Sequence, residues 1–180
     1  MQRRSLLLAP LLPLAALLTS GCAALSAALS APRSVAPSIM SPDFIVDALL
    51  DLAEVKQGDR LYDLGCGDGR IVIGAARRGA TSVGVDIDPG QIRLADAAAA
   101  TAKVSDRVHF LVTDLFTLDL RDATVVSLYL GEEANEKLMP RLRSELKRGT
   151  RIVSHEFSMG SWKPERKIWV GGRALYRWII

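Results

Sequence analysis

Apolar and polar positions along residues 41–180 follow two repeating patterns, one helical and one extended. Apolar side chains at helical spacing predict helices over residues 43–55, 70–78, 91–103 and 132–146. Short apolar runs predict strands over residues 60–64, 82–86, 108–112, 124–130, 150–157, 167–170 and 173–179. Gly171-Gly172 separates the last two strands and is typical of a tight hairpin. Because strands that alternate with helices form parallel βαβ units, we expect one α/β domain whose mostly parallel sheet ends in a C-terminal antiparallel hairpin.

The first 40 residues follow a different pattern. Arg3 and Arg4 precede an apolar stretch over residues 6–18, and small residues lead to Gly21-Cys22. This order is typical of a secretory signal peptide, and the stretch is shorter than the ~20 residues that span a bilayer. Its end resembles a bacterial lipobox, which implies removal of residues 1–21 and lipidation of Cys22.

Residues 22–40 are rich in Ala, Ser and Pro and predict a flexible tether. The folded domain is expected to begin at Ser41, which is the predicted N-cap of the first helix. The N-terminal pattern therefore predicts an exported, membrane-associated lipoprotein. An anchor that faces the cytoplasm, or a cytoplasmic form that starts at Met40, is the alternative.

Composition and charge narrow the class of protein. With 49% hydrophobic and 24% charged residues in 180, the chain fits one globular domain rather than a disordered, collagenous or coiled-coil protein. Two cysteines do not make a disulfide framework. Residues 40–136 hold 9 basic and 17 acidic side chains (9 − 17 = −8), and residues 137–180 hold 11 and 3 (11 − 3 = +8). The segregation indicates either two solvated faces or a basic surface for an anionic partner or lipid headgroups. No nucleic-acid partner is expected.

A glycine-rich loop follows the first predicted strand. The sequence Asp63-Leu64-Gly65-Cys66-Gly67-Asp68-Gly69 has glycine at three alternate positions between a strand and a helix. Missing Cβ atoms would let a ligand approach the backbone at the carboxyl edge of the sheet. A dinucleotide fold would need the third glycine one residue later, where Arg70 stands, so an NAD site is disfavoured.

Acidic residues follow the next two strands. Asp86 ends the second strand, where a carboxylate can accept two hydrogen bonds from a ribose diol, and Ile87 would offer an apolar face to a purine. Asp114 follows the third strand, where it would hold an adenine amino group or act as a helix N-cap. These positions predict a nucleoside site.

Together these motifs resemble those of class I S-adenosylmethionine-dependent methyltransferases, over residues 41–180. The resemblance implies a Rossmann-like seven-stranded sheet and S-adenosyl-L-methionine as cofactor. It places Asp63 near the methionyl ammonium, the Gly65–Gly69 backbone under the methionine and Asp86 on the ribose. The implied cofactor-binding residues are Asp63, Gly65, Cys66, Gly67, Gly69, Asp86, Ile87, Asp114 and Leu115.

A narrower resemblance concerns the substrate. Residues 63–73 (DLGCGDGRIVI), 125–130 (VVSLYL) and 151–162 (RIVSHEFSMGSW) are similar to protein-lysine methyltransferases that act on ATP synthase subunit c and the adenine nucleotide carrier. The chain departs from bacterial relatives at Ser158 and Ser161, where Asp is usual, and at Gly131-Glu132, where Pro often follows Tyr-Leu-Leu. The resemblance implies methylation of a protein lysine. A small-molecule methyltransferase and a non-catalytic lipoprotein of the same fold are the alternatives.

The expected catalytic residues follow the fourth strand. Tyr129 would place a carbonyl or hydroxyl beside the target amine, and Glu132 would attract the incoming cation. A core aromatic and a helix first-turn acid are the structural alternatives. His155, Glu156 and Trp162 are further candidates from the fifth strand and beyond. His155 as a satisfied strand residue and Trp162 as a packing residue are the structural alternatives. Neither of the two histidines has partners at ligand spacing, so no metal site is predicted.

Overall fold

The computed structural model describes residues 40–180, so the predicted signal peptide and all of the predicted tether except Met40 lie outside the described residues. In chain order the elements are α2 (Asp43–Leu52), β1 (Arg60–Leu64), α3 (Arg70–Arg77), β2 (Thr81–Asp86), α4 (Pro89–Ala102), β3 (Val108–Val112), β4 (Val125–Leu128), α5 (Glu132–Glu145), β5 (Arg151–His155), β6 (Arg166–Val170) and β7 (Arg173–Ile179). In this part of the chain, no helix is long and apolar enough to cross a membrane.

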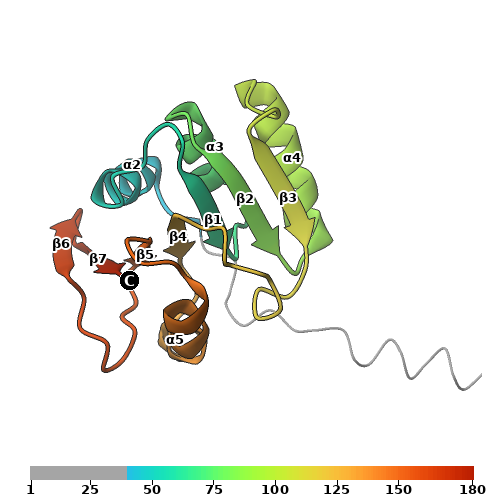
Figure 1. Cartoon of the computed structure of the whole chain (residues 1–180). Helices are drawn as coiled ribbons and strands as arrows, with labels where there is room; N and C mark the ends of the chain where they lie inside the picture. The colour runs from blue at the N-terminus through green and yellow to red at the C-terminus, as the bar shows by residue number, and fades with distance from the viewer. Residues whose placement is uncertain (1–39) are drawn as a thin grey trace, which may run out of the picture. The chain divides into compact units, whose positions relative to one another are not determined.

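The seven strands form one sheet in the order β3-β2-β1-β4-β5-β7-β6 (Figure 1). Strands β1 to β5 are parallel, and β7 runs antiparallel to both β5 and β6. The chain builds outward from β1 to β3 and then returns to place β4 on the other side of β1. This reversal makes the carboxyl ends of β1 and β4 the switch point where ligands bind in such sheets. The fold predicted from the sequence is confirmed.

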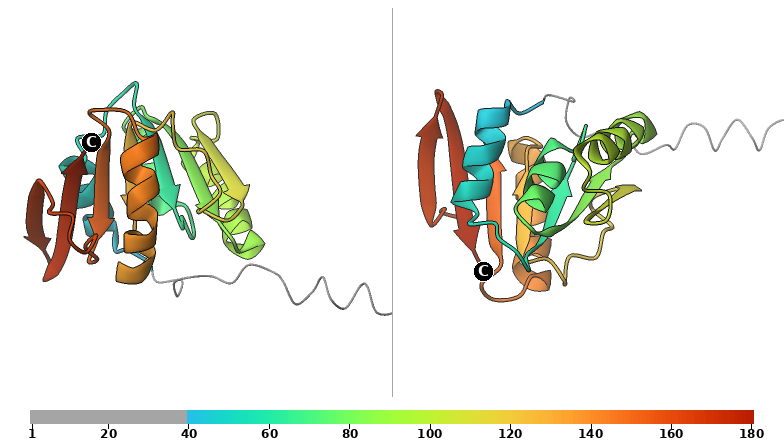
Figure 2. Two further views of the ribbon diagram at one scale, coloured as in Figure 1. Left: turned by 60° about the horizontal axis from the view of Figure 1, so that its bottom comes forward. Right: turned by 90° about the horizontal axis from the view of Figure 1, so that it is seen from above.

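Helices cover both faces of the sheet (Figures 1 and 2). Because side chains alternate along a strand, the consecutive buried residues Val125 and Val126 of β4 point to opposite faces. Val125 belongs to the core formed with α2 and α3, and Val126 belongs to the core formed with α5. Helix α4 packs beside α3 and extends the first layer over β2 and β3.

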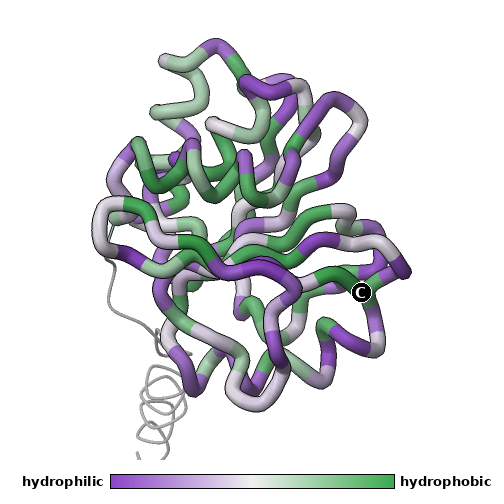
Figure 3. Tube along the Cα trace, turned by 90° about the vertical axis from the view of Figure 1, so that its left-hand side faces the viewer, coloured by the Kyte–Doolittle hydropathy of each residue, from purple (hydrophilic) through white to green (hydrophobic). Residues whose placement is uncertain are grey.

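The β6–β7 hairpin forms one edge of the sheet. Seen from this side, the trace carries both hydrophobic and hydrophilic stretches (Figure 3). On β6, Ile168 and Val170 pack towards the α2 core, whereas Trp169 is 66% exposed. Lys167 lies over the rings of Trp169 and Tyr176, 4.8 and 4.9 Å from their centroids. This stacking leaves the edge strand with a charged, aromatic outer face.

Two predicted strands end earlier than expected. β4 ends at Leu128 instead of residue 130, and β5 ends at His155 instead of residue 157. Positive φ values follow soon after both strand ends, at Gly131 with φ 114° and at Glu156 with φ 63°. Tyr129 and Glu156 therefore lie on irregular backbone just past the sheet.

The predicted helix cap at Ser41 is wrong. The N-cap of α2 is Pro42, and no side chain caps the helix. The Ser41 hydroxyl instead forms a hydrogen bond with Nδ1 of His155, 2.8 Å away. A tertiary contact with the end of β5 takes the place of the local capping interaction. This contact connects the start of the domain to the carboxyl edge of the sheet.

Candidate active site

The glycine loop is fastened to the neighbouring strand. The amides of Gly65 and Cys66 both donate to the Val85 carbonyl of β2, at 2.9 and 2.8 Å. The Gly69 amide then donates to the Cys66 carbonyl at 2.9 Å and turns the chain into α3. The loop is thus held at the switch point between β1 and β4, where the sequence predicted a ligand.

The three glycines of the loop have different roles. All have positive φ, at 84° for Gly65, 52° for Gly67 and 78° for Gly69. A Cβ on Gly65 would lie 2.6 Å from Leu130 Cδ2, and one on Gly69 would lie 2.8 Å from Ala95 Cβ. At these two positions glycine is needed for backbone conformation and for close packing against neighbouring side chains. Gly67 alone has open space, since its nearest neighbour would be Gln91 Oε1 at 3.9 Å.

The Cys66 thiol belongs to the protein core. Its side chain is only 6% exposed and packs in a cluster with Val72 and Ile92. Burial raises the pKa of this thiol well above its ordinary range, so Cys66 stays protonated and unreactive at neutral pH. Only the backbone of this residue is available to a ligand on the loop.

Asp63 is buried with one carboxylate oxygen satisfied and one not. Its Oδ1 accepts a hydrogen bond from the Ser127 hydroxyl, 2.5 Å away, and the side chain is 3% exposed. No group in residues 40–180 donates to its Oδ2. Burial raises the pKa of Asp63 to about 7, with the charges of Asp86 and Asp68 adding to the effect and the Ser127 hydrogen bond opposing it. A buried carboxylate with a free oxygen fits a cationic group such as an ammonium.

Asp86 links the glycine loop to the end of β2. Its Oδ2 accepts from the Gly67 amide and its Oδ1 from the Asp88 amide, both at 3.0 Å. The residue is half-buried, as is Ile87 beside it. Each carboxylate oxygen keeps a further lone pair, so the anchored side chain can still accept hydrogen bonds from a diol.

Asp114 and Leu115 lie past β3, next to Asp86 along the same edge. Asp114 Oδ1 accepts from the Phe116 amide at 2.9 Å in a local turn. No helix begins there in the described chain, so the alternative of Asp114 as a helix N-cap is wrong. Leu115 is half-buried.

The residues after β4 and β5 form an aromatic cluster. The Tyr129 ring lies 4.0 Å from the His155 ring and 5.9 Å from the Phe157 ring, centroid to centroid. The Tyr129 hydroxyl donates to Glu156 Oε2 at 3.2 Å, and Arg173 Nη1 donates to the same oxygen at 2.9 Å. Arg173 begins β7, and the sequence analysis did not single it out because only the antiparallel pairing of β5 with β7 brings it here.

His155 is fully buried beneath this cluster. Its Nδ1 is engaged by Ser41, and its Nε2 has no partner within residues 40–180. Burial lowers the pKa of His155 to about 4, so the imidazole is neutral at physiological pH. A neutral ring can pack against Tyr129 without bringing a charge into the core.

Glu132 and Trp162 do not join this cluster. Glu132 is exposed in the first turn of α5 and accepts a hydrogen bond from the Ser158 hydroxyl at 3.0 Å. The Trp162 carbonyl accepts from Trp178 Nε1 at 2.8 Å, and the two indole rings lie 6.1 Å apart. Trp162 thus packs against Trp178, and Glu132 lies in a helix first turn with its side chain still exposed to an incoming substrate.

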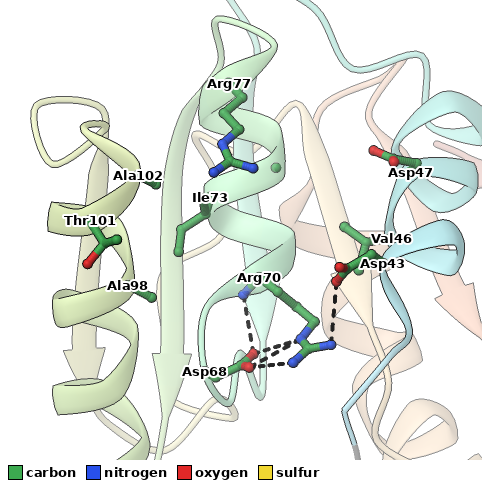
Figure 4. Close-up of a pocket in the computed structure, with 11 residues that line it drawn as sticks. Asp43, Val46, Asp47, Asp68, Arg70, Ile73, Arg77, Ala98, Thr101 and Ala102 are labelled. Carbon is green, nitrogen blue, oxygen red and sulfur yellow. Dashed lines mark hydrogen bonds and ion pairs between the residues drawn. The ribbon is translucent and has the colours of Figure 1, made fainter.

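A groove between α2, α3 and α4 borders the glycine loop from the helical side. Figure 4 shows Asp68 and Arg70 facing each other at its lower end, with Asp43 of α2 close to Arg70. Arg70 binds Asp68 at 2.6 Å and donates to the Ser41 carbonyl at 2.6 Å. The ion pair therefore connects the loop to the start of the domain. In residues 40–180, no cluster of three His, Cys, Asp or Glu could hold a metal ion.

Comparisons with known proteins agree with this geometry. The model of the ANTKMT methyltransferase domain matches residues 63–166. The chain is 43% identical over 134 residues to a protein-lysine N-methyltransferase of Saccharolobus islandicus (strain REY15A), covering 73% of this chain and 83% of that protein. It is 35% identical over 120 residues to the adenine nucleotide translocase lysine N-methyltransferase of Mus musculus, covering 66% of this chain and 52% of that protein.

Solved structures point to the same cofactor. An RNA methyltransferase from Salinibacter ruber, in complex with S-adenosyl-L-homocysteine, superposes with a TM-score of 0.78 at 49% sequence identity, covering 79% of this chain and 94% of that one. Both resemblances predicted from the sequence are confirmed, as is the expected cofactor. The chain belongs to the ANTKMT methyltransferase domain family and is an S-adenosylmethionine-dependent methyltransferase.

Proposed function

We propose that this protein methylates the side-chain amine of a lysine in a protein. The buried Asp63 with its free Oδ2, beside the open backbone of Gly67, carries the proposal, because it suits the ammonium of a bound methionyl group. The acceptor class follows from relatives named as lysine N-methyltransferases. When bound, the cofactor supplies a methyl group on a sulfonium, which is already activated for displacement.

The cofactor would lie along the carboxyl edge of β1, β2 and β3. Asp63 would bind its ammonium, and the backbone of the loop from Gly65 through Cys66 and Gly67 to Gly69 would lie under its methionine. Asp86 would accept from its ribose diol. In this arrangement Ile87 and Leu115 would contact the purine, and Asp114 would accept from the adenine amino group.

The acceptor would approach from the side of β4 and β5, where Tyr129 lies. A lysine ammonium must lose a proton before it can attack, at a cost of about 4–5 kcal/mol at pH 7. Positioning of the donor and the amine can offset roughly 7–11 kcal/mol of the barrier. Glu132, exposed at the rim, would attract the incoming cation.

Transfer of radiolabelled methyl groups from the cofactor to cell extract tests the acceptor class. We expect label in the protein fraction that survives nuclease treatment and is recovered as methyllysine after acid hydrolysis. The Salinibacter ruber relative is an RNA methyltransferase, so nuclease-sensitive label would favour RNA as acceptor. Label confined to small molecules would contradict both a protein and an RNA acceptor.

An Asp86→Ala variant separates cofactor binding from acceptor choice. Loss of the carboxylate should weaken the affinity for S-adenosyl-L-homocysteine by tens-fold, because each charge-assisted hydrogen bond contributes about 1.5–3 kcal/mol. Isothermal titration calorimetry on the folded variant measures this. Wild-type affinity would contradict the placement of the ribose.

We further propose that residues 1–21 are removed and that Cys22 is lipidated, which would make this a membrane-associated methyltransferase. The basic start, short apolar stretch and Gly21-Cys22 support this. Cell fractionation with a mass measurement of the mature N-terminus tests it. A diacylated Cys22 is the expected result, and a soluble form that begins at Met40 would contradict it.

A further inference from the structure

Glu156 has a left-handed backbone conformation although it does not lie at the end of a helix. In residues 40–180, the non-glycine residues with positive φ are Glu54, Lys103 and Glu156, at 54°, 59° and 63°. Lys103 is the C-cap of α4 and Glu54 follows the C-cap of α2, where left-handed residues are common. Glu156 instead follows a strand at the active edge of the sheet. Such strain persists where surrounding contacts hold it, and it often marks a functional position.

Strand β7 holds Glu156 from two sides. The Glu156 amide donates to the Ala174 carbonyl at 2.7 Å, and its Oε2 accepts from Arg173 Nη1 at 2.9 Å. The two side chains of this ion pair are only 35% and 38% exposed. The carboxylate is therefore placed by the hairpin as well as by its own strand.

This carboxylate determines where the hydroxyl proton of Tyr129 points. A phenol has one proton, and Tyr129 donates it to Glu156 Oε2 at 3.2 Å. Burial raises the pKa of Tyr129, the charge of Glu156 adds to the effect and the neighbouring Arg173 guanidinium opposes it, so the phenol keeps that proton at neutral pH. The phenol oxygen then offers lone pairs, and not a proton, to a group in front of it.

His155, Phe157 and Glu132 do not supply the same control. The rings of His155 and Phe157 fix the plane of the Tyr129 ring but do not contact its hydroxyl through any hydrogen bond in this part of the chain. Nδ1 of His155 is engaged by Ser41. Glu132 accepts from Ser158 and lies outside the cluster.

We propose that Glu156, held by Arg173, is a positioning residue that acts through Tyr129. It turns the phenol proton away from the acceptor, so that the phenol oxygen accepts an N–H of the neutral lysine amine and orients the amine's lone pair. The inference rests on the proposed lysine methylation. In that step the amine, having lost its proton to solvent, forms the N–C bond, the C–S bonding pair returns to sulfur, and the positive charge passes to nitrogen.

The test compares Glu156→Gln, Glu156→Gly and Tyr129→Phe for formation of methyllysine on the protein fraction of cell extract. A glutamine amide can donate to the phenol oxygen and reverse its hydrogen bonding. Glycine removes the carboxylate but adopts positive φ without strain, so this variant keeps the fold even if Glu156→Gln does not. We expect kcat to fall roughly 10–100-fold in each, with the KM for cofactor and the affinity for S-adenosyl-L-homocysteine unchanged.

A double variant distinguishes positioning from a structural role. The double variant Glu156→Gln with Tyr129→Phe should lose no more kcat than Tyr129→Phe alone. Both substitutions act on the same hydrogen bond between Tyr129 and Glu156, so the second has nothing further to remove. Glu133→Gln, an exposed change in the first turn of α5, is the matched control and should keep wild-type kcat.

The outcomes separate this inference from the proposed function. If the wild-type protein forms no methyllysine, the proposed function fails and the inference fails with it. If the wild type forms methyllysine and Glu156→Gly keeps its kcat, or if the two losses multiply in the double variant, the inference alone is overturned.

Discussion

Three aspartates at the edge of the sheet differ in what surrounds them. Asp63 is buried with a free oxygen, Asp86 is anchored by two backbone amides, and Asp114 accepts from its own turn. Each is an acidic residue near the carboxyl end of a strand, so the sequence alone does not distinguish their roles. Because Asp63 is buried, a bound cation would favour the ionised form of its carboxyl group.

The raised pKa of Asp63 predicts a pH dependence of cofactor binding. The folded protein keeps this proton up to about pH 7, whereas the ordinary pKa of an aspartate is 3.8, so without a bound cation the free energy of unfolding falls as pH rises from about 4 to 7. Binding an ammonium favours the carboxylate. The affinity for S-adenosyl-L-homocysteine should therefore decrease by up to about tenfold per pH unit from pH 7 to pH 5.

Calorimetry of Asp63→Asn supplies the control. This variant should bind weakly, with little change in affinity over the same range, since the amide does not titrate. An equally steep pH profile in the variant would mean that another group is responsible.

At the scale of elements, short connections determine the site. The loop from β1 to α3 and the ends of β4 and β5 carry most of the candidate residues. Periodicity predicted every helix and strand of residues 40–180, but it placed the C-terminal ends of β4 and β5 two residues too late. An apolar run does not reveal where the backbone leaves the sheet, because that depends on Gly131 and Glu156 and on contacts with β7.

Alanine at two positions of the glycine loop should have different effects. Gly67→Ala introduces backbone strain of about 1 kcal/mol into open space, so its main effect should be weaker cofactor binding. Gly69→Ala adds a clash with Ala95 and Phe110 and should lower the free energy of unfolding by about 3 kcal/mol in total. Urea denaturation measures both. Equal stability of the two variants would contradict the packing argument.

At the scale of the whole molecule, some basic residues of the C-terminal third form ion pairs with acidic residues of the preceding part of the chain. Arg151 of β5 pairs with Asp59 before β1, and Arg177 of β7 pairs with Glu54 after α2. Arg177 is 7% exposed, so this charge does not belong to a solvated face. These pairs connect the basic C-terminal third of the sequence to the acidic part.

Cofactor binding should stabilise the whole domain. A ligand present at 100 times its dissociation constant adds about 2.7 kcal/mol to the free energy of unfolding. For a domain of this size, Tm should rise by roughly 5–10 °C with S-adenosyl-L-homocysteine. Differential scanning calorimetry checks this, with Asp86→Ala as the control that should show a smaller rise. An unchanged Tm in the wild type would contradict binding to the folded state.

The order of strands and helices, the glycine loop and the family motifs follow from the sequence alone, because periodicity and local spacing are properties of neighbouring residues. The tertiary contacts of those residues do not follow from the sequence alone. Ser41 bonds His155 instead of capping a helix, Gly69 makes room for Phe110, and Arg173 fixes Glu156 and through it Tyr129. Such contacts join residues far apart in the chain, so only the packing of the sheet decides them.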